Sequence, residues 1–102
     1  MLLRPLALAS AAVMLAAVPA VPASAASTTI AVRDDYFRPR VKTVARGTRV
    51  IWVNRGEDPH TVTTRRWSVV LSPGERYARG VRRGFRYRCR YHDGMTGRIV
   101  VG

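Results

Sequence analysis

Several chemically distinctive residues are scarce in this sequence. Its 102 residues include one cysteine, two histidines and three methionines, and six acidic residues stand against 18 basic ones. A single cysteine cannot close an intramolecular disulfide, and iron–sulfur clusters and C-x-x-C-H haem attachment need more thiols. Small domains without disulfides are marginally stable, and a metal site is another way to stabilise them. The positions of the few Cys, His and Met residues are therefore the most informative feature of the chain.

The first 25 residues have the pattern of a secretory signal peptide. Arg4 gives a positive start, residues 6–18 form an apolar run, and Ala23-Ser24-Ala25 fits the small-residue cleavage pattern. The run is shorter than the roughly 20 residues of a membrane-spanning helix. We predict a signal peptide over residues 1–25 and one domain over residues 26–102. The protein is then exported, to the periplasm, the extracellular space or the cell surface, with no integral membrane segment in the mature chain.

The predicted mature chain is strongly basic. Only Arg4 is lost with the signal peptide, so 17 of the 18 basic residues remain with all six acidic ones, a formal charge of +11. All of these basic residues except Lys42 are arginines. Such a charge favours an anionic partner, either nucleic acid, a membrane or wall surface, or an acidic protein. Export argues against nucleic acid, and the arginine excess can also reflect genomic composition alone.

The mature chain has the pattern of an all-β protein. No segment shows a helical period, and short alternating stretches are separated by Gly and Pro turns. The stretch 49–54 is apolar on both faces, which predicts a central strand. Pro39 confines its own segment to an edge or an irregular crossing. This spacing predicts a β-sandwich of about seven short strands.

The clearest alternation occupies residues 85–91. The predicted inner face carries the aromatic residues and the thiol, namely Phe85, Tyr87, Cys89 and Tyr91. The predicted outer face carries three arginines, namely Arg86, Arg88 and Arg90. Successive strand side chains point to opposite faces of a sheet. We therefore expect the thiol inside the sandwich and the guanidinium groups in solvent.

The cysteine begins a Cys-x2-His-x2-Met motif formed by Cys89, His92 and Met95. The other histidine, His60, opens a predicted strand about thirty residues upstream, where a loop at the end of a sandwich can bring it to the same place. Singly, these residues are more often a buried thiol, a core methionine and surface or core histidines. Together, two imidazoles, a thiolate and a thioether are the ligand set of a blue-copper centre. Gly94 and Gly97 give the short loop backbone freedom.

Other sites fit this set less well. A zinc site of one cysteine and two histidines with an open position is conceivable, but it leaves Met95 unused. A Cys89 nucleophile with a histidine base lacks an orienting third group and an oxyanion loop. A catalytic copper enzyme needs a second copper site, for which the chain has no spare histidine. A metal-free adhesion sandwich leaves the concentration of these residues in one pattern without a purpose. We therefore expect no enzyme and no catalytic residues.

Four stretches of the sequence resemble the small cupredoxins, the plastocyanin and amicyanin group of type 1 copper proteins. The stretches are Phe37-Arg38-Pro39, residues 47–54, residues 59–63 and residues 87–101. The two residues between His92 and Met95 are similar to the short amicyanin-type loop. The resemblance implies a Greek-key β-sandwich holding one copper ion. It also implies that the three equatorial copper ligands are His60, Cys89 and His92. The implied axial ligand is Met95.

The function that this resemblance implies is outer-sphere transfer of single electrons by Cu(II)/Cu(I). His92 is then the electron port, surrounded by an apolar docking patch of Pro59, Tyr91 and Met95. We expect a monomer with a redox protein partner, and the arginines favour an acidic one. The alternative is extracytoplasmic copper binding, sequestration or delivery without a redox partner, which would use the same ligands.

Overall fold

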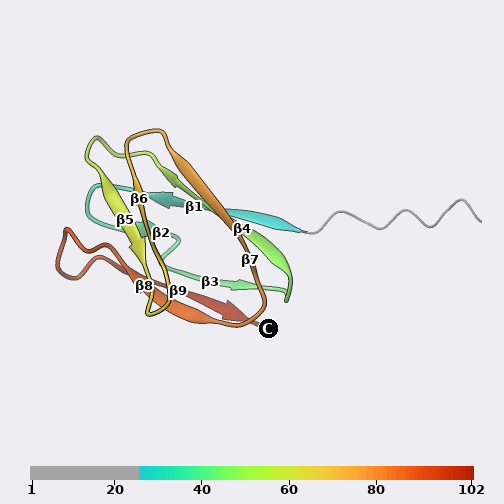
Figure 1. The fold of residues 1–102 in the computed structure, drawn as a ribbon. Helices are drawn as coiled ribbons and strands as arrows, with labels where there is room; N and C mark the ends of the chain where they lie inside the picture. The colour runs from blue at the N-terminus through green and yellow to red at the C-terminus, as the bar shows by residue number, and fades with distance from the viewer. Residues whose placement is uncertain (1–25) are drawn as a thin grey trace, which may run out of the picture.

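The computed structural model describes residues 26–102 and shows nine β-strands in that range (Figure 1). In chain order they are β1 Ser27–Val32, β2 Phe37–Arg38, β3 Val41–Val44, β4 Thr48–Asn54, β5 His60–Thr63, β6 Ser68–Leu71, β7 Arg76–Val81, β8 Phe85–Arg88 and β9 Thr96–Val101. The predicted signal peptide, residues 1–25, lies outside the described residues. Residues 26–102 contain no helix with the length and apolar character needed to cross a membrane.

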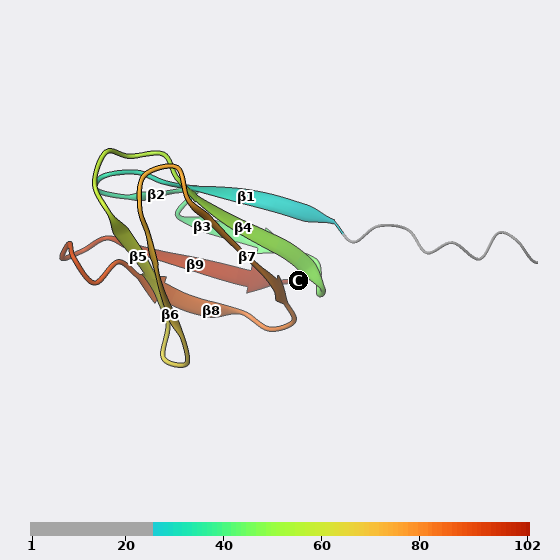
Figure 2. The same ribbon diagram turned by 45° about the horizontal axis from the view of Figure 1, so that its top comes forward.

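The strands form two sheets that pack face to face, as the two views in Figures 1 and 2 show. One sheet has the order β2-β1-β4-β7 and the other the order β3-β9-β8-β5-β6. The pairs β1–β4 and β3–β9 are parallel, and the remaining neighbours are antiparallel. The predicted β-sandwich is confirmed. The described chain has more strands than the predicted seven because the segment around Pro39 forms two short strands, β2 and β3, one at an edge of each sheet.

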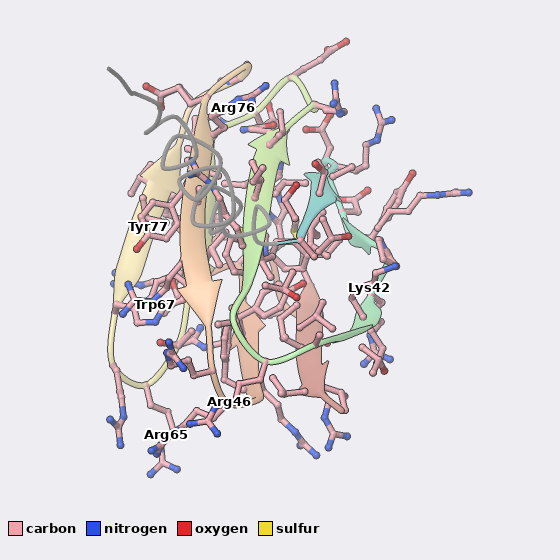
Figure 3. All side chains as sticks on the ribbon, turned by 90° about the vertical axis from the view of Figure 1, so that its right-hand side faces the viewer. Lys42, Arg46, Arg65, Trp67, Arg76 and Tyr77 are labelled. Atoms are coloured by element: carbon pink, nitrogen blue, oxygen red, sulfur yellow. The ribbon has the colours of Figure 1, made fainter. Side chains whose placement is uncertain are left out.

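The strand β4 is central, as its apolar residues on both faces predict. It lies between β1 and β7, and Val50 and Trp52 are fully buried. Trp52 contacts an aromatic cluster whose outer members, Trp67 and Tyr77, lie side by side with ring centroids 5.4 Å apart (Figure 3). Edge-to-face and stacked rings of this kind stabilise a small core beyond the area they bury.

Three loops meet at one end of the sandwich, opposite the C-terminus (Figures 1 and 2). They are the β1–β2 loop (33–36), the β4–β5 loop (55–59) and the β8–β9 loop (89–95). We call this region the ligand end. Because the loops emerge from different strands of both sheets, residues far apart in the sequence become neighbours there.

Candidate metal centre

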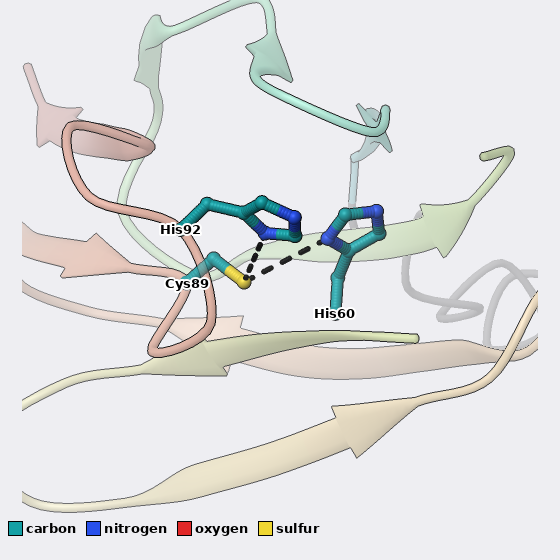
Figure 4. A group of neighbouring side chains, drawn as sticks. All are labelled: His60, Cys89 and His92. Atoms are coloured by element: carbon teal, nitrogen blue, oxygen red, sulfur yellow. Dashed lines mark hydrogen bonds between the residues drawn. The ribbon is translucent and has the colours of Figure 1, made fainter. Parts of the chain in front are cut away.

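The cysteine sulfur and the two histidine rings predicted from the sequence as metal ligands meet at the ligand end (Figure 4). Ligand atoms of His60, Cys89 and His92 all lie within 4.8 Å of one another. The Cys89 Sγ is 3.7 Å from His60 Nδ1 and 3.6 Å from His92 Nδ1. His60 is the first residue of β5, Cys89 directly follows β8, and His92 lies in the loop that Cys89 opens. The sandwich therefore brings together the two parts of the motif that are distant in sequence.

The ring of His60 is oriented by a carboxylate that the sequence did not single out. His60 is fully buried, and its Nε2 lies 3.0 Å from Asp34 Oδ1 in the β1–β2 loop. The same oxygen accepts the backbone N–H groups of Glu57 (2.9 Å) and Asp58 (3.2 Å). The hydrogen bond from His60, followed by the Asp58 amide, lowers the pKa of Asp34. A carboxylate at Nε2 holds the ring proton there and leaves the Nδ1 lone pair directed at the thiol.

The Cys89 thiol is poised to ionise. It is buried, and the Thr61 amide donates to Sγ at 3.4 Å. Burial raises the pKa of Cys89, but hydrogen bonds from His92 and from the Thr61 and Tyr91 amides, together with the contact to His60, outweigh it and lower the pKa to about 6. The thiolate is the form that binds metals. The site therefore stabilises its sulfur in the ligating form before any metal arrives.

His92 is the outer imidazole of the group. Its side chain is only partly buried, whereas His60 is fully enclosed. The hydrogen bond to Cys89 raises the pKa of His92 despite some desolvation, and the charges of Cys89, Asp35 and Asp58 add to the effect. Asp35 and Asp58 therefore lie close enough to His92 to favour its charged form.

Two hydrogen-bonded clamps fix the backbone around the donors. Thr61 Oγ1 accepts the Arg90 amide at 2.8 Å, which joins the start of β5 to the β8–β9 loop. Buried Asn54 donates from Nδ2 to the carbonyls of Asp58 and Leu71, each at 2.8 Å, and its Oδ1 accepts the Gly56 amide. Sequence analysis missed Asn54, Thr61 and Asp34. Their roles depend on contacts between loops that have no local signature, although a polar residue ending a buried strand is a weak signal for Asn54.

Met95 is buried rather than exposed on the surface of the ligand end. It is 1% exposed, its carbonyl accepts the Cys89 amide at 2.9 Å, and its own amide donates to the His92 carbonyl at 3.3 Å. These bonds close the loop tightly around Cys89. The predicted docking patch is therefore wrong in one member, because Met95 is covered. The axial role of Met95 stays a prediction.

The predicted strand at 85–91 is too long. The strand β8 ends at Arg88, and Tyr91 is 55% exposed rather than on the inner face. The chain leaves the sheet at Cys89 because the loop must turn back within a few residues. Gly94 has φ +80°, as a tight turn requires. Gly97 serves packing instead, since a Cβ there would collide with the Tyr87 ring.

The donor chemistry fits a type 1 copper ion. One acidic thiol and two imidazoles with inward Nδ1 atoms form a three-donor group of the kind that blue-copper centres use. Asp34 contacts the His60 ring and the Thr61 amide donates to the Cys89 sulfur, as is typical of metal sites, in which outer partners orient the ligands.

Comparison with known proteins supports the same fold. No protein-family model and no curated protein sequence matches the chain. Among solved structures, a purple cupredoxin from Nitrosopumilus maritimus superposes with a TM-score of 0.68 at 18% identity, over 74% of this chain and 99% of that one. Amicyanin from Paracoccus versutus gives a TM-score of 0.65 at 22% identity, over 81% and 86%. A copper-containing nitrite reductase from Thermus scotoductus gives 0.68 at 25% identity, over 84% of this chain and 24% of that one.

These similarities agree with the geometry of the site. Each of the three superposed proteins covers most of the described residues of this chain. Residues 26–102 therefore have the fold of the small cupredoxins, and their His60–Cys89–His92 group supports a single type 1 copper site.

Proposed function

We propose that this chain is an exported type 1 copper protein that carries single electrons. His60, Cys89 and His92 are the equatorial ligands, and Met95 is the axial one. The observation that carries the proposal is the approach of two Nδ1 atoms to one acidic thiol, at 3.6 and 3.7 Å. The amicyanin and purple cupredoxin folds support it, because copper proteins of this architecture superpose on nearly the whole described chain.

The described residues are suited to holding such a site rigid. A copper ion bound there supplies a one-electron couple whose potential depends on the axial ligand and on the surroundings of the sulfur. Asp34 fixes the His60 ring, and the Thr61 amide stabilises negative charge on Sγ. The loops around the donors are held by hydrogen bonds of backbone groups and buried side chains. The ligands therefore change position little when the charge of the site changes.

His92 is the proposed electron port because it is the imidazole nearer to solvent. Pro59 and Tyr91, both exposed, supply the apolar surface beside it. The three loops of the ligand end carry five carboxylates and three arginines. An acidic partner docking over His92 would meet these carboxylates, so we propose a redox partner with a neutral or basic docking surface.

Export belongs to the same proposal. The pattern of residues 1–25 predicts cleavage after Ala25. Intact-mass measurement of the protein recovered from cells tests this step. A mature chain beginning at Ala26 is expected, and a chain that keeps residues 1–25 outside the cytoplasm would contradict it.

The metal site is tested by adding Cu(II) to the purified protein and recording its visible spectrum. An intense blue thiolate-to-copper band at one equivalent is expected, and Cys89→Ala should remove it. A colourless protein that still binds copper would favour copper storage or delivery over electron transfer. Absence of copper binding would overturn the proposal.

A further inference from the structure

A groove of about 580 Å³ lies on the five-stranded sheet, and its lining residues Arg88 and Thr96 directly adjoin Cys89 and Met95 in the chain. Its walls come from the start of β3, the end of β5 with the turn that follows, β8 and β9. Five arginines line it: Arg40, Arg65, Arg86, Arg88 and Arg98. Three threonines also line it: Thr63, Thr64 and Thr96. We call this feature the arginine groove.

The arginine groove contains no counter-charge. No Asp or Glu is among its lining residues. Within residues 26–102 the ion pairing is confined to His60 and Asp34, so no arginine there is paired with a carboxylate. Arg40 donates to Thr96 Oγ1 at 3.1 Å, and this is the one hydrogen bond that the groove's five guanidinium groups make within the described chain. Most of their donors therefore face solvent.

The register of the sheet holds like charges together. Arg86 on β8 lies directly opposite Arg98 on β9, and Arg88 lies two residues along from Arg86 on the same face. Like charges directly opposite one another on neighbouring strands are destabilising. Figure 3 shows Arg65 projecting from one end of the sandwich, beyond the strands. Cations crowded in a concave surface focus a positive field that an anion relieves.

The chemistry of the walls specifies the anion. Guanidinium groups present planar paired donors that match phosphate oxygens, and hydrogen bonds between charged groups are roughly twice as strong as neutral ones. Five guanidinium groups spread over several strands exceed what one phosphate needs. We propose that the arginine groove binds an anion bearing two or more linked phosphate groups. This proposal does not rest on the proposed electron transfer.

Calorimetric titration of the purified full chain with inorganic tripolyphosphate tests the proposal. One-to-one binding is expected, weakening steeply with added salt because phosphate contacts release counterions. The double variant Arg86→Gln/Arg98→Gln should bind at least about tenfold more weakly, since it removes two charge-assisted contacts. The control Arg46→Gln/Arg49→Gln removes the same charge from exposed positions outside the groove and should change affinity less than about threefold.

The outcomes separate specific binding from bulk charge. Equal loss of affinity in both double variants, or no saturable binding by the wild type, would overturn the proposal. If the first double variant fails to fold, Arg65→Gln in the β5–β6 turn takes its place, with Arg46→Gln as its control. Co-sedimentation with cardiolipin vesicles, whose headgroup joins two phosphates through a glycerol, distinguishes the sources of phosphate. Vesicle binding that depends on Arg86 and Arg98 supports a lipid headgroup, and tripolyphosphate binding alone supports a free phosphorylated molecule.

Discussion

The ligand end and the arginine groove are built in opposite ways. At the ligand end, charged and polar groups are paired: Asp34 holds the buried His60 ring, and the Thr61 amide holds the Cys89 sulfur. In the groove, five arginines share one concave surface without a carboxylate. Paired polar groups keep a site rigid, whereas unpaired cations remain available to an external anion. The same small sandwich therefore separates a preorganised metal site from an open electrostatic surface.

The largest difference between the ligand end and the arginine groove is expected when the buried His60 imidazole is removed. His60→Ala deletes one of the three donors and leaves Asp34 without its partner, so copper affinity should fall by more than about a hundredfold, since outer partners alone contribute 10–100-fold. Competition with a chromophoric copper chelator measures this change. Tripolyphosphate affinity of the same variant should stay unchanged. A parallel loss of both affinities would mean that the two regions are not independent.

A large shift is also expected in the acidity of the metal-free thiol. The ultraviolet absorbance of the Cys89 thiolate should titrate with a pKa of about 6 rather than near the ordinary 9.0. A folded pKa below the unfolded one adds stability as pH rises from about 6 towards 9, and removes it as pH falls through 6. His92, with its raised pKa, has the opposite sign and loses its contribution as pH rises. A thiol midpoint near 9 would contradict the hydrogen-bonded site.

Asp34→Asn should have an intermediate effect at the ligand end. Loss of a negative charge from the His60 ring disfavours Cu(II), so the reduction potential should rise, on the order of 60 mV for a tenfold change in a one-electron equilibrium. Cyclic voltammetry measures it. Asp35→Asn is the matched control, because it removes the same charge from the adjacent residue, whereas the hydrogen bond to His60 is made by Asp34. Equal shifts in both variants would reduce the role of Asp34 to general electrostatics.

A smaller difference is expected between a glycine of the ligand loop, which has a strained backbone conformation, and a glycine of a regular strand. Gly94→Ala places a Cβ at φ +80°, so it should lower the free energy of unfolding by about 1 kcal/mol. Gly80→Ala, in β7 with open space around its Cα and no positive φ, should be neutral or slightly stabilising. Urea denaturation of the two variants tests the difference. Similar free energies of unfolding would contradict a strained turn at Gly94.

The smallest effect is expected in the groove itself. Arg86→Gln relieves the repulsion between Arg86 on β8 and Arg98 on β9. The free energy of unfolding without ligand should therefore rise by roughly 0.2–1 kcal/mol at low salt. High salt should abolish the gain because exposed charges are screened. Arg49→Gln is the control at an exposed position of the other sheet. A loss of stability in Arg86→Gln would show that the arginine makes favourable contacts.

Local patterns predicted the elements better than the contacts between them. The alternation before Cys89 correctly placed Tyr87 and Cys89 inside and Arg86 and Arg88 outside, because strand side chains alternate whatever the topology. The prediction for Tyr91 was wrong because alternation does not reveal where a strand ends.

The candidate site was predictable as a donor set, but its supporting shell was not. Rare residue types identified His60, Cys89 and His92 without any alignment. Asp34 has no local sequence signal for this role, and its contact with His60 depends on how the β1–β2 loop meets β5 across 26 residues of sequence. Likewise, Arg40 and Arg65 join the arginine groove only because β3 and β5 lie in the same sheet as β8 and β9.

X-ray absorption at the copper edge of the protein loaded with one equivalent of copper is the most direct test of the metal centre. One sulfur and two imidazole nitrogens in the first coordination shell are expected, with the sulfur contribution lost in Cys89→Ala. A shell of nitrogen and oxygen alone, unchanged by Cys89→Ala, would show that copper binds elsewhere and contradict the account.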